Sequence, residues 1–232
     1  MPAPFSAQKI KVFLQPALPQ MIDTLRRFVL AESPSLEKTH ADRCCGIIAT
    51  EWQKHGLEVH RVPQKNRGDH LRIVSTSNSS RRPKGQLLVL GHYDTVYASG
   101  TLKKMPFRLA AGKAYGPGTF DMKAGIVQAL FAHLALHKLN LAPSKRIVFL
   151  WTSDEEIGSH CSRKLIETEA SRSDAVFVLE PSFGPHGMIK TARKGVGEAE
   201  IIVHGRASHA GLAPEEGINA VHELCHQVSL VS

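Results

Sequence analysis

The sequence lacks long apolar runs. None of its 232 residues belongs to a stretch approaching the roughly 18 apolar residues that a membrane span needs, which excludes a spanning helix. Residues 1–17 contain only the short apolar patch Val12–Leu14, which is too weak for the apolar region of a signal peptide. We therefore expect a cytoplasmic protein with no membrane partner.

Cysteine is also scarce. The four cysteines show no CxxC spacing, and the adjacent Cys44 and Cys45 fall in a helical pattern. This arrangement predicts buried, reduced thiols in a reducing compartment.

Aromatic residues make up only 6% of the chain, which bears on its positive charge. The net charge of +8 is compatible with nucleic-acid binding, but the aromatic residues are not interleaved with basic ones as base stacking requires. The tight basic cluster Arg81–Lys84 follows the serine-rich segment Thr76–Ser80 and is typical of an exposed turn. We expect no nucleic-acid partner and keep a nucleic-acid binder only as a distant alternative.

What the chain has is a series of short apolar runs separated by helical patterns. Residues 86–90, 147–151 and 175–179 show no polar alternation, which is typical of strands buried on both faces of a sheet. The spacing of apolar residues predicts helices over 20–31, 36–54, 121–139 and 159–169, and paired strands over 57–62 and 71–75. Alternating strands and helices predict an α/β fold with a mostly parallel sheet covered by helices.

The pattern changes after Pro181. The sequence there predicts one strand ending at Ile201–Val203, a loop over 206–217 and a helix from about Ile218. We therefore expect a metal-binding catalytic domain over residues 1–194 and the beginning of a smaller α+β domain over 195–232.

Polar clusters follow the predicted strands. They occupy residues 91–95, 152–159 and 180–181, and a further cluster over 116–123 opens a predicted helix. Ligands of open α/β sheets bind at the carboxyl ends of the strands, where these clusters would meet. An imidazole and several carboxylates in one crevice predict one or two divalent metal ions, with zinc favoured and cobalt or manganese tolerated.

Each cluster alone has an ordinary structural explanation. His92 and Asp94 could belong to a surface loop, the acidic residues 154–156 could form a solvated turn, and Asp121 could simply cap a helix. Their joint order at successive strand ends favours a functional site.

Five segments carry a family resemblance: Gly91–Val96, Tyr115–Gly125, Thr152–Ser159, Leu179–Pro181 and Ala207–Gly211. In this order they resemble the zinc carboxypeptidases and deacylases, which include glutamate carboxypeptidase, acetylornithine deacetylase, succinyl-diaminopimelate desuccinylase and aminoacylase. The chain is most similar to the glutamate carboxypeptidase branch, over about residues 20–230.

The resemblance implies a site with two metal ions bridged by Asp121. His92 and Glu180 would complete the protein ligands of one metal, and Glu156 would bind the other. Glu155 would be the general base, and Asp94 would orient His92, as carboxylates beside ligand histidines do.

The resemblance also implies the reaction and its partners. The reaction would be metal-assisted hydrolysis of an amide bond in an N-acyl or peptidyl amino acid, with Glu155 moving a proton from water to the leaving amine. His209, in the smaller lid and dimerisation domain, would reach across a homodimer and support the tetrahedral oxyanion.

The chain departs from the family in length. Members return from the lid to the catalytic domain, and that segment supplies the last histidine ligand of the second metal, a role that no residue here can be assigned. We expect a fragment or a shortened protein with little hydrolase activity by itself. A deacylase of the acetylornithine or diaminopimelate type is one alternative, and a noncatalytic metal-binding or interaction protein is another.

Overall fold

The computed structural model describes residues 7–75, 83–141, 143–195 and 197–231. The chain divides into two compact units, Met1–Ser182 and Phe183–Ser232, which we describe separately. This division falls earlier than residue 194, and the domain boundary expected from the sequence stays a prediction. The exposed turn expected over residues 76–84 lies largely outside the described residues.

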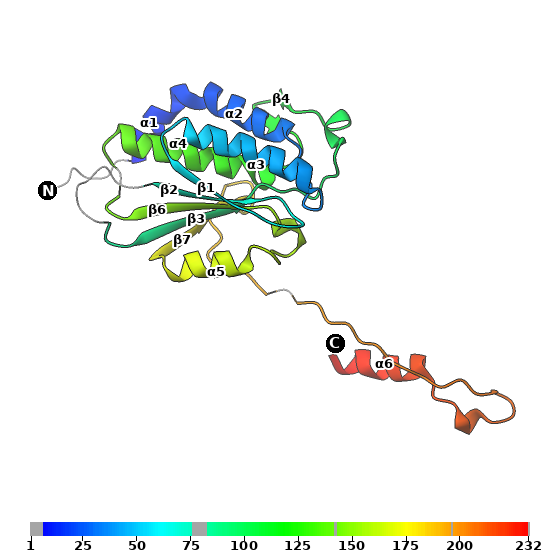
Figure 1. Ribbon diagram of the computed structural model, residues 1–232. Helices are drawn as coiled ribbons and strands as arrows, with labels where there is room; N and C mark the ends of the chain where they lie inside the picture. Colours follow the sequence, from blue (N-terminus) through cyan, green and yellow to red (C-terminus); the bar gives the residue numbers. More distant parts are fainter. Residues whose placement is uncertain (1–6, 76–82, 142, 196, 232) are drawn as a thin grey trace. The chain divides into compact units, whose positions relative to one another are not determined.

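The first unit is built on a five-stranded sheet (Figure 1). In spatial order its strands are β1 (Glu58–Val62), β2 (His70–Ser75), β6 (Arg146–Thr152), β3 (Gln86–His92) and β7 (Ala175–Val178). Strands β6, β3 and β7 run parallel, whereas β1, β2 and β6 pair antiparallel. The α/β fold class is confirmed, and the sheet is mixed.

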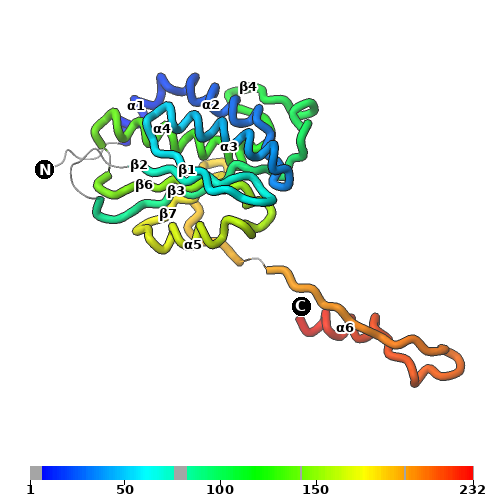
Figure 2. Tube along the Cα trace, viewed as in Figure 1, coloured from blue at the N-terminus to red at the C-terminus, as the bar shows by residue number. Residues whose placement is uncertain are grey.

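Helices cover both faces of this sheet. The helices α1 (Ala7–Leu14), α2 (Leu18–Leu30), α3 (Lys38–Gln53) and α4 (Ala124–Lys138) lie on one face, and α5 (Arg163–Ser171) lies on the other (Figure 1). Helices α1 and α2 both contact α4, although α4 lies far from them in the sequence (Figure 2). Helices α2 to α5 fall within a few residues of the predicted ranges, whereas α1 was not predicted.

Aromatic side chains fill the core between the helices and the sheet. The ring centroids of Trp52, on α3, and Phe149, on β6, lie 4.6 Å apart, and those of Trp52 and Trp151 lie 5.8 Å apart. Both tryptophans are fully buried. Val148 and Leu150, on the other face of β6, are also fully buried, so the apolar run of β6 is buried on both faces, as predicted.

Shorter elements occupy the loops. They are 3-10 turns at Gln15–Ala17, Thr101–Lys103, Glu155–Ile157 and Pro214–Glu216, a π-helical turn at Thr119–Lys123, and a hairpin of β4 (Arg108–Ala110) and β5 (Lys113–Tyr115). None of the helices in the described ranges is long and apolar enough to cross a membrane. Cys44 and Cys45 are buried and free, as predicted.

The prediction for strand β7 is wrong in one respect. Its residues were expected to be buried on both faces, but Val176, Phe177 and Val178 are 41%, 53% and 54% exposed. The reason is that β7 is the last strand of the sheet and pairs only with β3.

The second unit contains the helix α6 (Ala220–Val231). The predicted strand ending at Ile201–Val203 is not formed. Among residues 197–231, the structure shows one strand-like pairing, the isolated bridge between Arg206 and Ile218. Ile201 and Ile202 are exposed. A strand requires a neighbour that satisfies its backbone groups, and the apolar sequence alone does not supply one.

Candidate metal centre

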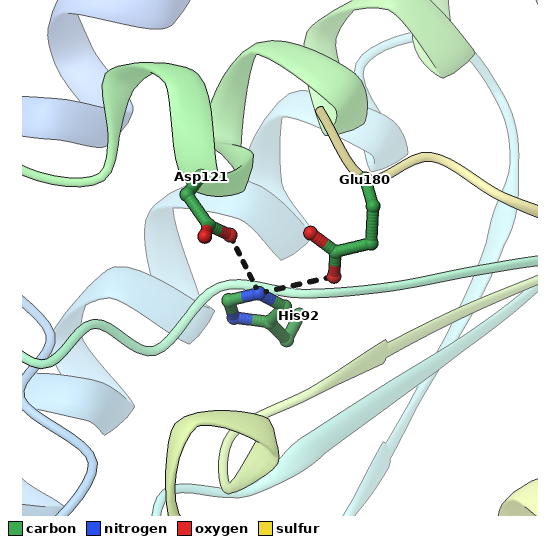
Figure 3. Close-up of side chains that lie close together, drawn as sticks. All are labelled: His92, Asp121 and Glu180. Carbon is green, nitrogen blue, oxygen red and sulfur yellow. Dashed lines mark hydrogen bonds and ion pairs between the residues drawn. The ribbon is translucent and has the colours of Figure 1, made fainter. Parts of the chain in front are cut away.

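His92 is the last residue of strand β3, and the acidic side chains of the candidate metal centre surround its buried ring. Its side chain is 1% exposed. Its Nδ1 lies 3.0 Å from the carbonyl oxygen of Asp94, so in the neutral ring Nδ1–H donates there and Nε2 keeps a lone pair. That Nε2 lies 3.1 Å from Oδ1 of Asp121 and 3.3 Å from Oε1 of Glu180 (Figure 3).

Asp121 lies in the π-helical turn Thr119–Lys123, just before α4. Its backbone, with φ −114° and ψ 103°, departs from helical values, and the cap position of α4 is taken by Lys123. The structure therefore does not support the alternative in which Asp121 only caps a helix. The carboxylate is directed towards His92 instead (Figure 3).

Glu155 and Glu156 follow strand β6 in a short 3-10 turn. Oε2 of Glu155 lies 3.7 Å from His92 Nε2. The backbone N–H groups of both residues donate to the buried carboxylate of Asp94, each at 3.3 Å. Asp94 thereby connects the end of β3 to the turn that carries Glu155 and Glu156.

Three of the predicted site residues form one ligand set. His92, Asp121 and Glu180 each offer an atom, these atoms lie within 4.8 Å of one another, and the described residues contain no other such set of three histidine, cysteine or acidic side chains. An imidazole nitrogen with carboxylate oxygens suits zinc and similar divalent ions. The residues present therefore fit the expected metal, and Glu156 lies outside this set.

The pKa values of the centre reflect the crowding of carboxylates around one imidazole. Burial disfavours the charged form of His92, but hydrogen bonds with Asp94 and Glu180 outweigh it and raise the pKa of His92 to about 11. Burial and then the charge of Glu180 raise the pKa of Asp121. A cation is therefore favoured at Nε2, and a divalent metal ion would replace the proton held there.

Burial also raises the pKa values of Glu155 and Glu156, and the neighbouring carboxylates add to this effect against the opposing charge of His92. A carboxylate with a raised pKa is a better proton acceptor near neutral pH. This is the property required of a general base.

Three side chains support the centre although the sequence assigned them no role. Ser35 Oγ donates to Asp94 Oδ2 at 2.6 Å, and the His92 N–H donates to Sδ of Met122 at 3.2 Å. The buried Lys123 donates to carbonyl oxygens at the end of α2. Met122 and Lys123 lie within a cluster that the sequence singled out, whereas nothing in the sequence pointed to Ser35.

His209 belongs to the second unit. Its side chain is exposed, and its Nδ1 accepts a hydrogen bond from the N–H of Gly211 at 3.2 Å. The oxyanion role expected of it stays a prediction.

Comparison with known proteins identifies the family. The model of peptidase family M20/M25/M40 matches residues 88–231. The chain belongs to this family. It is 34% identical to carboxypeptidase G2 of Pseudomonas sp. (strain RS-16) over 209 residues, which cover 88% of the chain and 49% of that protein. The family resemblance drawn from the motifs is confirmed.

A second relative is acetylornithine deacetylase of Pasteurella multocida, which is 33% identical over 187 residues. The match covers 79% of the chain and 46% of that enzyme. The chain thus spans about half the length of the curated relatives it matches.

Solved structures share the fold. Aminopeptidase PepT of Bacillus cereus matches 91% of the chain and 56% of its own length, with a TM-score of 0.69 and 20% identity. Human carnosine dipeptidase 1 matches 76% of the chain and 41% of its own length, with a TM-score of 0.64 and 21% identity. At this identity the likeness supports the fold alone.

Proposed function

We propose that this protein hydrolyses the amide bond of an N-acyl or peptidyl amino acid with a free carboxylate, in the manner of a glutamate carboxypeptidase. The observation that carries the proposal is the convergence of Asp121, Glu155 and Glu180 on Nε2 of His92, at 3.1 to 3.7 Å. Membership of the M20/M25/M40 family and the similarity to carboxypeptidase G2 support it.

We infer that two divalent metal ions, zinc by preference and cobalt or manganese as substitutes, serve this reaction. His92, Asp121 and Glu180 would hold the first ion, and Asp121 and Glu156 would hold the second. When bound, such ions polarise a substrate carbonyl and lower the pKa of water.

Two acidic side chains of the protein would carry out the remaining steps, proton transfer and the orientation of His92. Glu155 accepts a proton from the attacking water at its carboxylate and delivers it to the leaving amine; burial raises its pKa towards the range that suits both steps. Asp94, hydrogen-bonded to Ser35 and to the turn carrying Glu155, keeps His92 in the tautomer whose Nε2 faces the carboxylates.

Further parts of the proposal concern the assembly. We propose that the functional protein is a cytoplasmic homodimer in which His209 stabilises the oxyanion. The free state of all four cysteines is consistent with a reducing compartment. Dimerisation and the role of His209 rest on the family resemblance.

A deacetylase of the acetylornithine type is the second candidate, favoured by the 33% identity to the Pasteurella enzyme. The two reactions share the cleaved bond and differ in the amino acid that carries the acyl group. Assaying N-acetylornithine beside N-acylglutamates therefore separates them.

The proposal is tested by measuring bound zinc and released glutamate in the same preparations. We expect the 232-residue chain to bind zinc and to release glutamate from an N-acylglutamate slowly. Asp121→Asn should lose most of the zinc, because its carboxylate belongs to the ligand set. Glu155→Gln should keep the zinc and lose at least about 100-fold in turnover, as the loss of a general base does.

A matched control is Glu167→Gln, an exposed carboxylate on α5 that pairs with Arg163 at 2.9 Å. It should change neither quantity. Glutamate release that survives both chelation of zinc and the Glu155→Gln change would refute the proposed reaction. Equal zinc content in the wild type and Asp121→Asn would refute the proposed ligands.

A further inference from the structure

A cavity with basic walls lies between helices α2 and α3. The two helices contact each other and cover the same face of the sheet (Figure 1). Together with Arg61 of strand β1 they border a cavity of about 600 Å³, a size at which proteins bind small organic molecules. None of the metal-centre residues lines it. We call it the basic cavity, because four basic side chains and no acidic one line it: Arg27, Arg43, Lys54 and Arg61.

Two of these four charges are compensated within the fold. Arg27 lies 2.8 Å from Glu51 and 3.2 Å from Asp23, and Lys54 lies 3.1 Å from Glu51. Two carboxylates therefore balance two cations. Because Glu51 is only 4% exposed, these pairs fix the wall of the basic cavity without adding net charge to it.

Arg43 and Arg61 differ, because no carboxylate compensates their charges. Neither guanidinium lies within 4.0 Å of a carboxylate oxygen in the part of the chain that the structure describes. The charge of Asp69 interacts with that of Arg61 at longer range, but this carboxylate pairs with Lys38 at 3.0 Å. The basic cavity therefore keeps the positive charges of Arg43 and Arg61 in excess.

Gly46 allows Arg61 to approach Arg43 on the surface of α3. Gly46 follows Arg43 by three residues, and residues three apart are neighbours on one helix face. A Cβ at Gly46 would lie 3.0 Å from Nη2 of Arg61, so this guanidinium occupies the space of the missing side chain. Glycine weakens a helix interior, and the close approach of Arg61 accounts for it here. Two like charges on one small surface repel each other, and an anion bound between them removes the repulsion.

Apolar side chains form the rest of the lining. Leu30 and Ala31, at the end of α2, and Ile47, on α3, lie beside the basic groups. Leu30 is 43% exposed although it is apolar. A ligand that combines an anionic group with an apolar one therefore fits the basic cavity, because it covers the apolar surface and neutralises the charges.

The two uncompensated arginines favour phosphate over carboxylate as the anionic group. A guanidinium donates two parallel hydrogen bonds to the oxygens of either group. A phosphomonoester carries about 1.5 to 2 negative charges near neutral pH, whereas a carboxylate carries one. The phosphate charge therefore matches the excess charge of the basic cavity more closely.

We propose that the basic cavity binds a small organic phosphate, a phosphomonoester on an apolar group. Arg43 and Arg61 hold the phosphate, and Leu30 and Ile47 contact the apolar group. The site shares no residue with the metal centre, so it is independent of the proposed hydrolysis.

The test is a titration of the full chain, labelled with ¹⁵N-arginine, with phenyl phosphate, in which NMR reads each arginine Nε–H separately. EDTA is present throughout, so that no metal ion at His92 binds the phosphate. The variants Arg43→Gln and Arg61→Gln assign the two signals. We expect both signals to shift along one saturation curve.

The size of each effect follows from the contacts. Arg43→Gln, read at Arg61, and Arg61→Gln, read at Arg43, should each weaken binding at least about tenfold, as the loss of a charged hydrogen-bond donor does. Inorganic phosphate should bind roughly tenfold more weakly than phenyl phosphate, because it lacks the apolar group.

Two further variants separate a specific site from general positive charge. The matched control Arg26→Gln removes the same charge from an exposed position of α2 that does not line the basic cavity, and should change the affinity by less than about twofold. Gly46→Leu keeps every charge but fills the space beside Nη2 of Arg61, and should weaken binding about tenfold. Leucine favours a helix more than glycine does, so this variant should fold.

Three results would overturn the proposal. The first is a dissociation constant for phenyl phosphate above about 10 mM. The second is an affinity that Arg43→Gln, Arg61→Gln or Gly46→Leu leaves unchanged, or that Arg26→Gln lowers as much as they do. The third is an equal affinity for benzoate, which would make the ligand group a carboxylate.

Discussion

The substitution Lys123→Met tests how the centre is held in the fold. Lys123 is 1% exposed, and its Nζ donates to the carbonyl oxygens of Phe28 and Ala31, each at 3.0 Å. These carbonyls lie at the end of α2, where the last carbonyls lack partners within the helix. The ammonium therefore connects the end of α2 to the turn that carries Asp121.

The expected loss of stability follows from these contacts. Hydrogen bonds from a charged donor contribute about 1.5 to 3 kcal/mol each, so the two bonds contribute about 3 to 6 kcal/mol before the cost of burying the charge. That cost is substantial, since burial lowers the pKa of Lys123. Methionine fills similar space without a charge but leaves the carbonyl oxygens of Phe28 and Ala31 without this donor, at about 1 to 3 kcal/mol each, so we expect a net loss of about 3 kcal/mol.

Urea unfolding followed by tryptophan fluorescence measures this loss, because Trp52 and Trp151 are both fully buried in the first unit. Zinc affinity should fall about tenfold in the same variant, because Lys123 fixes the turn containing Asp121. The control Lys138→Met, at the exposed end of α4, should change stability by less than about 0.5 kcal/mol. A loss below about 1 kcal/mol for Lys123→Met would refute the reasoning.

Three further predictions concern individual contacts. Ser35→Ala removes the 2.6 Å hydrogen bond to Asp94 and should weaken zinc binding about tenfold in calorimetry. Phe28→Ala empties a fully buried position and should cost about 4 kcal/mol in urea unfolding. Burial raises the pKa of Glu169, but its hydrogen bond with Arg72 at 2.8 Å outweighs this and lowers it. Glu169→Gln should therefore cost about 2 kcal/mol at pH 7.

The pH dependence of the last prediction has a definite sign. The unfolded state binds a proton at Glu169 more readily than the folded state, so this contribution is present above the unfolded pKa of about 4.3 and is lost as the pH falls through the folded pKa. Glu169→Gln should flatten the loss of stability below about pH 4.3. A wild-type acid profile retained in this variant would contradict the assignment, as would unchanged zinc affinity in Ser35→Ala or a loss below about 1.5 kcal/mol in Phe28→Ala.

Much of the fold, and the fact that the residues of the metal centre lie close together, could be predicted from the sequence. The spacing of apolar residues indicates which face of a helix or strand is buried. That spacing was enough to predict the strands β3 and β6 and the helices α2 to α5. Parallel strands end at a common edge, so the polar residues after β3, β6 and β7 had to approach one another. Strand order therefore predicted that His92 would meet Glu180, whereas Asp121, in the turn before α4, was expected there from the polar cluster over 116–123 and from the family resemblance.

Tertiary structure decided what depends on partners distant in the chain. The exposure of Val176–Val178 follows from the position of β7 at the sheet edge, and the absence of a strand at Ile201–Val203 follows from the lack of a pairing neighbour in the described second unit. Ser35 and Lys123 acquire their roles from acceptors on other elements. Burial and hydrogen-bond partners are properties of the assembled chain, because each requires surfaces that are brought together only by folding.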